Sequence, residues 1–101
     1  MKVLLVCAGG MSTSILIKKM EKYAAANAID FQAVARAATD YEDIYRDYDV
    51  ILLGPQVSYK KGEIAAATGK PLAVIAQMDY ALGNAENIFK QINRILPNKF
   101  L

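Results

Sequence analysis

The sequence predicts an α/β fold of one domain, built on an open four-stranded parallel sheet flanked by helices. Short apolar runs alternate along the chain with segments of helical periodicity, a pattern typical of β-α-β units. The chain has 101 residues, of which 54 % are hydrophobic and 22 % are charged. This length suits one globular core and is too short for two ordinary domains. We therefore expect a single domain over residues 1–101.

Four apolar runs are the predicted strands. Residues 3–7 and 50–53 are continuously apolar, as expected of strands that are covered on both faces. Residues 72–76 form another such run. Residues 31–37 alternate enough to indicate a strand nearer an edge. Because right-handed crossovers join parallel strands, these runs favour an open sheet.

Helical periodicity fills the intervals between the strands. Apolar residues recur on one helical face over residues 16–27, and more strongly over residues 85–96, which Pro97 follows. Residues 63–68 predict a shorter helix that ends at Gly69. The resulting order alternates strand and helix along the whole chain.

A further short helix is expected over residues 41–45, with Thr39 or Asp40 as its N-cap. In parallel sheets, ligands bind beyond the carboxyl ends of the strands, where the strand order reverses. The segments 54–59 and 77–80 follow the third and fourth strands. We expect both segments to face the end of the first strand.

The cysteine and histidine counts exclude several kinds of site. Cys7 is the only cysteine and the chain has no histidine. This excludes an internal disulfide, a zinc site of the usual Cys/His kind, a Cys-His nucleophilic pair and Cys-x-x-Cys redox chemistry. We expect no metal and no cofactor.

The hydropathy and charge patterns indicate the compartment and exclude some partners. The apolar start at residues 3–7 is too short for a signal segment or a membrane span, so we expect a cytoplasmic protein that does not insert into a membrane. The net charge is only +2, and Glu21 interrupts the densest lysine cluster, at residues 18–22. This cluster indicates a solvated helix face and no nucleic-acid partner.

Cys7 ends the first predicted strand and precedes a segment of small and hydroxylated residues. Backbone N–H groups and the positive end of a helix dipole at this place favour a phosphate-like dianion, and the same field favours a thiolate. Two glycines allow close approach to an oxyanion, and three hydroxyls add donors; Ser12 is also a candidate N-cap. The predicted phosphate-binding residues are Ala8, Gly9, Gly10, Met11, Ser12, Thr13 and Ser14.

The residues around Cys7 leave several interpretations open. A lone cysteine at a strand end is often an inert, buried apolar residue. Low-molecular-weight tyrosine phosphatases and arsenate reductases carry Cys-x5-Arg, but here Thr13 occupies the arginine position and no arginine precedes Arg36. The missing guanidinium favours a site that accepts a phosphoryl group and passes it on. A non-catalytic anion-binding or regulatory module is a further alternative.

Two segments carry a family resemblance. Residues 7–14 resemble the Cys-x-x-Gly-Met-Ser-Thr-Ser signature of the IIB components of the phosphoenolpyruvate-dependent sugar phosphotransferase system, in the lactose/cellobiose (chitobiose) family. Residues 52–57, together with Tyr59, resemble that family's Leu-Leu-Gly-Pro-Gln segment. Length and element order match over nearly the whole chain. The resemblance implies the sheet order 2-1-3-4 and a phosphatase-like phosphate loop after the first strand.

The resemblance also implies a function. Cys7 would accept a phosphoryl group from a phosphohistidine on a IIA protein and transfer it to a sugar bound by the membrane permease IIC. The chain would thus be the IIB subunit of a protein-phosphohistidine–sugar phosphotransferase. A chain without histidine needs a partner to supply the donor. The expected sugar is a β-linked disaccharide such as cellobiose, chitobiose or lactose, and the expected state is a monomer.

Of four residues considered outside the loop, three have two interpretations each and one has a single interpretation. Tyr59 and Tyr80, with Met11, either form an apolar docking rim or pack locally. Gln56 either orients the loop through hydrogen bonds or belongs to a simple turn. Asp79 is expected to cap a helix or turn, because a carboxylate beside a phosphate dianion would repel it.

Overall fold

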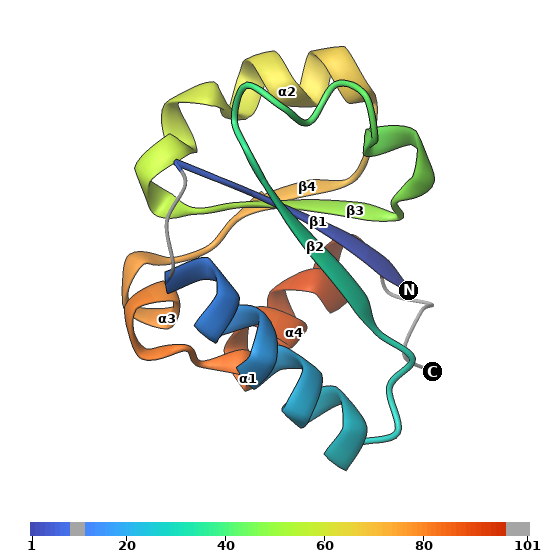
Figure 1. Ribbon diagram of the computed structural model, residues 1–101, viewed down its shortest axis with the longest axis vertical. Coiled ribbons are helices and arrows are strands. Elements are labelled where there is room, and N and C mark those ends of the chain that lie inside the picture. Colours follow the sequence, from blue (N-terminus) through green and yellow to red (C-terminus); the bar gives the residue numbers. More distant parts are fainter. Residues whose placement is uncertain (9–11, 97–101) are drawn as a thin grey trace.

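Four parallel strands form a single sheet in the order β2-β1-β3-β4 (Figure 1). The computed structural model describes residues 1–8 and 12–96. The strands are β1 (Lys2–Cys7), β2 (Gln32–Ala37), β3 (Val50–Leu53) and β4 (Leu72–Val74). The predicted fold class, parallel pairing and strand order are confirmed, and β2 lies at an edge as expected.

Helices cover both faces of the sheet. The α-helices are α1 (Ser12–Ala26), α2 (Lys61–Thr68), α3 (Gln77–Leu82) and α4 (Ala85–Ile95), and the 3₁₀ helices are η1 (Tyr45–Asp47) and η2 (Pro55–Lys60). Figure 1 shows α1, α3 and α4 on one side of the sheet and α2 on the other. The predicted helices over residues 16–27, 63–68 and 85–96 correspond to α1, α2 and α4.

The two central strands are buried on both faces, which explains their continuous apolar sequence. In β1, Val3 and Leu5 belong to the core beneath α1 and α4, whereas Leu4 and Val6 belong to the core beneath α2. All four side chains are at most 1 % exposed. Alternation across a strand therefore divides one apolar run between two cores.

The helix expected over residues 41–45 is wrong. These residues form turns that lead into η1, and the N-cap of η1 is Ile44, without a capping side chain. Tyr41 is buried against the sheet and its carbonyl accepts hydrogen bonds from the N–H groups of Ile44 and Tyr45. A segment this short forms a stable α-helix only with strong tertiary support, and here the apolar side chains anchor a turn instead.

Helix α3 is not among the predicted helices, because residues 77–80 are predicted only as a segment that follows the fourth strand and faces the end of the first. The helix begins after Ala76 and ends at Gly83, whose φ of 64° is left-handed. As a result β4 ends at Val74, two residues earlier than predicted. Asn84 then caps α4, since its side chain accepts a hydrogen bond from the backbone N–H of Asn87 at 3.2 Å.

The expected capping role of Asp79 is also wrong. The N-cap of α3 is Ala76, and Asp79 lies inside the first turn of that helix. Its Oδ1 accepts a hydrogen bond from Asn87 Nδ2 at 3.1 Å. The carboxylate therefore ties α3 to α4.

Removing the Tyr41 hydroxyl should reduce the loss of stability at high pH. Burial raises the pKa of Tyr41, and Glu42, Glu63 and Tyr45 add to the shift. When the pKa of a group is raised in the folded state, its protonated form contributes to the free energy of unfolding. This contribution is fully present below the unfolded-state pKa of about 10 and is lost as the pH rises through the folded-state pKa. Urea unfolding at pH 9 and pH 11 should show a smaller loss for Tyr41→Phe than for the wild type. Equal losses would contradict the prediction.

Alanine at three glycines should separate backbone strain from crowding. Gly62 lies in α2 with open space around it, so Gly62→Ala should stabilise the protein by about 0.5–1 kcal/mol. Gly69 has a φ of 65° in open space, so Gly69→Ala should destabilise it by about 1 kcal/mol. Gly83→Ala should cost more than Gly69→Ala, because its Cβ would also lie 2.5 Å from Lys19 Cδ. Urea denaturation measures all three, and a different rank order would refute the prediction.

Candidate functional site

Cys7 lies at the carboxyl end of β1, between strands on both sides. Its register partner in β2 is Ala37. On the other side, the N–H of Gly54 donates a hydrogen bond to the carbonyl of Val6 at 2.9 Å, which brings the chain after β3 alongside Cys7. In the sheet, β2 lies on one side of β1, and β3 and β4 lie on the other, so the strand order reverses at β1. Cys7 therefore occupies the switch point at which such sheets bind ligands.

The thiol is buried and directed at the backbone of β2. Cys7 is 4 % exposed, and its Sγ donates a weak hydrogen bond to the carbonyl oxygen of Arg36 at 3.7 Å. The Arg36 guanidinium donates to the carbonyl of Ala35 at 2.9 Å, and the residue is exposed. Arg36 thus brings a carbonyl group to the sulfur and does not replace the guanidinium that is missing from the loop.

Three segments meet at Gly54. A Cβ atom built on Gly54 would lie 3.1 Å from Gln56 Oε1, 3.5 Å from Tyr80 Cε2 and 3.7 Å from Cys7 Cβ. Since all three groups surround the same small space, the segments after β3 and β4 do converge on Cys7, as the sequence predicts. Of the four residues considered outside the loop, Gln56 and Tyr80 belong to this convergence.

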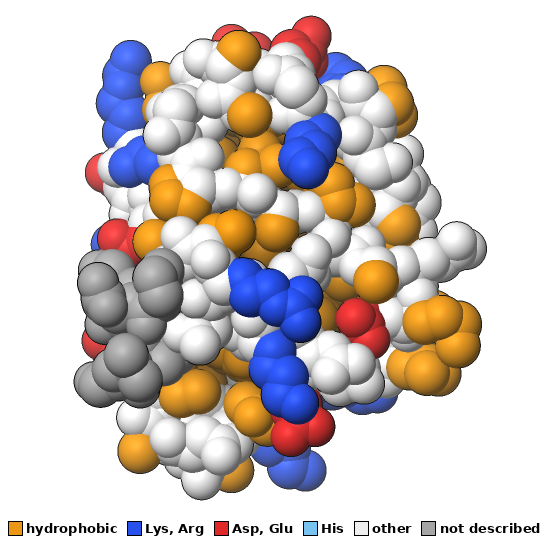
Figure 2. All heavy atoms as spheres, turned by 180° about the vertical axis from the view of Figure 1, so that it is seen from behind, with side chains coloured by type: hydrophobic (Ala, Val, Ile, Leu, Met, Phe, Trp, Pro, Cys, Tyr) orange, Lys and Arg blue, Asp and Glu red, His pale blue; other side chains and the backbone are white. Residues whose placement is uncertain are grey.

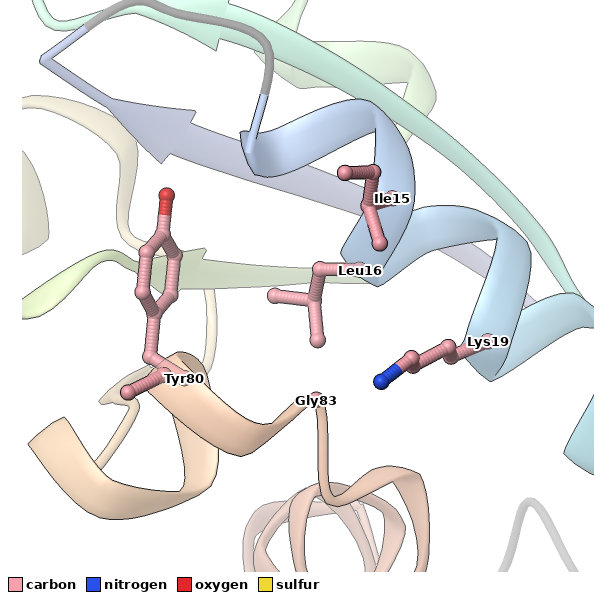
Figure 3. Close-up of a pocket in the computed structure, with 6 residues that line it drawn as sticks. Ile15, Leu16, Lys19, Tyr80 and Gly83 are labelled. Carbon is pink, nitrogen blue, oxygen red and sulfur yellow. The ribbon is translucent and has the colours of Figure 1, made fainter.

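Thr13 connects the start of α1 to this cluster. It is the second residue of α1 and is only 2 % exposed. Its Oγ1 shares a hydrogen bond of 3.3 Å with the hydroxyl of Tyr80, which belongs to α3. Figure 3 shows the Tyr80 ring standing out from α3, with its oxygen directed toward the start of α1. This contact was not predicted, and no local pattern in the sequence indicates it.

The other predicted loop residues are placed only in part. Ala8 is exposed in the bend after β1, and Ser14 is exposed in the first turn of α1. Ser12 begins α1, but its side chain is not described. Residues 9–11, which include Gly9, Gly10 and Met11, lie outside the described residues. The ring of backbone donors and the capping role of Ser12 stay predictions.

Large exposed apolar side chains surround the carboxyl end of the sheet. Tyr59 in η2 is 77 % exposed, and Met78 and Leu82 in α3 are 67 % and 63 % exposed. Ile15, in the first turn of α1, is 59 % exposed and lines a cavity of about 150 Å³ between α1 and α3, together with Tyr80 (Figure 3). These side chains provide apolar contact area close to the site.

Charged side chains are distributed differently. On the face seen from behind, Lys and Arg side chains gather down the middle, with hydrophobic side chains on both sides (Figure 2). The first turn of α1 contains no acidic residue.

Within residues 1–8 and 12–96, no group of His, Cys, Asp and Glu side chains is arranged to hold a metal ion. Within the same ranges, none of the helices has the length and hydropathy needed to cross a membrane.

Comparison with known proteins decides the family. Residues 2–91 match the family model described as "PTS system, Lactose/Cellobiose specific IIB subunit", where PTS denotes the phosphotransferase system. The chain belongs to this family. As a IIB subunit of a sugar phosphotransferase system, it is a phosphotransferase.

Two relatives match this IIB subunit along most of their length, and a third matches it over a small part of its own. The galactose-specific EIIB component of Lactococcus lactis subsp. cremoris (strain MG1363) is 35 % identical over 93 % of this chain and 94 % of its own. The cellobiose-specific EIIB component of Lactococcus lactis subsp. lactis (strain IL1403) has the same identity and coverage. The lactose-specific EIICB component of Lacticaseibacillus casei is 32 % identical over 67 % of this chain and 12 % of its own.

A solved structure supports the same conclusion. The solution structure of the cellobiose-specific phosphotransferase IIB component from Borrelia burgdorferi covers 100 % of this chain and 96 % of its own. It superposes with a TM-score of 0.77 at 33 % sequence identity. The family resemblance that the sequence carries in residues 7–14 and 52–57 is confirmed.

Proposed function

We propose that this IIB subunit is a phosphocysteine carrier in sugar uptake. Cys7 accepts a phosphoryl group from a phosphohistidine on IIA and transfers it to a sugar bound by IIC. The observation that carries this proposal is the buried thiol at the switch point of the sheet, next to Thr13 at the start of α1, in a chain of the IIB family. No cofactor enters either transfer.

The two transfers balance without another reactant. In the first, the Cys7 thiolate attacks phosphorus, the S–P bond forms as the N–P bond breaks, and the histidine leaves with the electron pair of that bond. In the second, a sugar hydroxyl oxygen attacks phosphorus, the O–P bond forms as the S–P bond breaks, and the hydroxyl proton is released. The thiolate is thereby regenerated. Positioning and electrostatics supply the catalysis, as is usual for phosphoryl transfer.

The proposed phosphate-binding residues are 8–14. Backbone N–H groups of this segment, with the hydroxyls of Ser12, Thr13 and Ser14, hold the equatorial oxygens of the phosphoryl group. The 15-residue helix α1 places its positive end at this point, and its first turn carries no carboxylate that would repel a dianion. Both features favour the phosphorylated state of Cys7.

The proposed partners are IIA as donor and IIC as acceptor. A relative whose name combines the two components, the EIICB component, supports the pairing with IIC. Gln56, Tyr59 and Tyr80 support the loop or contact these partners. The galactose-specific and cellobiose-specific relatives are equally similar, so identity does not select the sugar. The lactose/cellobiose family supports the proposal of a β-linked disaccharide. The carrier is proposed to act as a cytoplasmic monomer.

Cys7→Ser should abolish phosphoryl acceptance from IIA. A serine hydroxyl at this place is far less nucleophilic than a thiolate, so phosphorylated IIA should leave the variant unmodified. Intact-protein mass spectrometry should show one added phosphoryl group on the wild type and none on Cys7→Ser. Circular dichroism checks that the variant is folded, and unphosphorylated IIA is the negative control. A folded Cys7→Ser protein that accepts a phosphoryl group as fast as the wild type would refute the proposal.

The protein should not behave as a phosphatase. Thr13 stands at the arginine position of the phosphatase loop, and the Arg36 guanidinium is bonded to Ala35. Turnover of para-nitrophenyl phosphate by the wild type should therefore not exceed that of Cys7→Ser. Robust turnover that disappears in Cys7→Ser would instead favour hydrolysis as the activity.

A further inference from the structure

We propose that Tyr80 is a positioning residue for phosphoryl transfer: its hydroxyl donates to Thr13 Oγ1 and so directs the Thr13 proton toward the phosphoryl group on Cys7. The inference rests on the proposed function, in which the Thr13 hydroxyl holds a phosphoryl oxygen. It adds a residue from α3, a helix distant in sequence from the loop.

The contact joins a buried hydroxyl to its partner across the site. Thr13 is buried, at 2 % exposure, although its side chain ends in a hydroxyl. Its 3.3 Å hydrogen bond is with the hydroxyl of Tyr80, 67 positions further along the chain. A buried hydroxyl is costly without a partner, so Tyr80 makes it possible to keep Thr13 at this place.

The direction of this hydrogen bond decides what Thr13 can do for an anion. A threonine hydroxyl has one proton and two lone pairs. If Thr13 donates to Tyr80, it presents only lone pairs to a phosphoryl oxygen, which repels them. If Tyr80 donates to Thr13, the threonine proton is free for the phosphoryl oxygen. A phenol is the stronger donor of the two hydroxyls, and the chain Tyr80 to Thr13 to phosphoryl oxygen is cooperative.

The position of the Tyr80 hydroxyl is fixed by the packing of α3. Gly83 ends the helix in a left-handed conformation, and Lys19 Nζ of α1 donates to the carbonyl of Leu82 at 3.2 Å. The Tyr80 ring lies against the space at Gly54, 3.5 Å from the Cβ position. Figure 3 shows Lys19 reaching from α1 toward Gly83 on the same side as the ring. A hydroxyl held in this way is preorganised for its role.

The test is a double-mutant cycle on phosphoryl transfer from phosphorylated IIA. The readouts are the transfer rate and the equilibrium ratio of phosphocysteine to phosphohistidine. Tyr80→Phe keeps the ring and should lower both by about 3- to 10-fold, the range of one neutral hydrogen bond. In the Thr13→Val background, Tyr80→Phe should have no further effect. Thr13→Ser should retain the response to Tyr80→Phe, because it retains the hydroxyl.

Tyr23→Phe is the matched control. Tyr23 is also a half-buried tyrosine packed on the core beneath α1 and α4, where its ring stacks on Phe89. Loss of its hydroxyl should leave both readouts unchanged. Thermal unfolding of every variant separates a loss of fold from a loss of positioning.

The outcomes separate this inference from the proposed function. Wild-type protein that gains no phosphoryl group on Cys7 would refute the function and the inference with it. Normal phosphorylation with wild-type values for Tyr80→Phe would overturn the inference alone. A Tyr80→Phe effect that persists undiminished beside Thr13→Val, or that Tyr23→Phe reproduces, would also overturn it, because the effect would then come from packing.

Discussion

The burial of β1 on both faces and along both edges is the constraint on which the rest of the structure depends. Its side chains from Val3 to Val6 are at most 1 % exposed, and β2 and β3 take up its backbone hydrogen bonds. A strand enclosed in this way offers chemistry only at its carboxyl end, which is Cys7. The same core that stabilises the sheet therefore fixes the position of the sulfur, and the elements that follow β1, β3 and β4 are brought to it.

Helix α3 shows how a marginal element becomes part of the site. With six residues it is too short to be stable alone, so its position depends on contacts with the two longer helices. Lys19 holds it to α1, and the Asp79 carboxylate holds it to α4 through Asn87. The Tyr80 hydroxyl of this helix shares a hydrogen bond with Thr13 of α1. The helix and the start of α1 thus stabilise each other at the place where the phosphoryl group is proposed to bind.

The sequence predicts the strands well because a run of apolar residues indicates a strand buried on both faces. The bounds of β3 are those predicted, residues 50–53. The sequence predicts strand order only through the family resemblance, since order depends on contacts that no local pattern encodes. Helix α3 escapes prediction because six residues are too few to show a helical period, and its apolar Met78 and Leu82 are exposed; Gly83 was the available signal. The pairing of Thr13 with Tyr80 likewise depends on the fold. Helices α1 and α3 follow β1 and β4, and the carboxyl ends of these parallel strands lie at the same edge of the sheet.

A phosphoryl carrier needs a phosphorylated state that is stable enough to form. The free energy of this state must not be so low that the second transfer becomes slow. A guanidinium can bind a phosphoryl group through two parallel hydrogen bonds between opposite charges, and hydrogen bonds to charged groups are worth about 1.5–3 kcal/mol each. A neutral hydroxyl offers one such bond and no opposite charge. Because each 1.4 kcal/mol changes a rate about tenfold, a well deepened by an arginine would slow the second transfer by that factor or more. The proposed phosphate site, in which Thr13 is held by Tyr80 and the Arg36 guanidinium is bonded to Ala35, would avoid this depth. Neutral hydroxyls are thus the better ligands for a carrier, whereas a guanidinium suits an enzyme that hydrolyses its phosphocysteine.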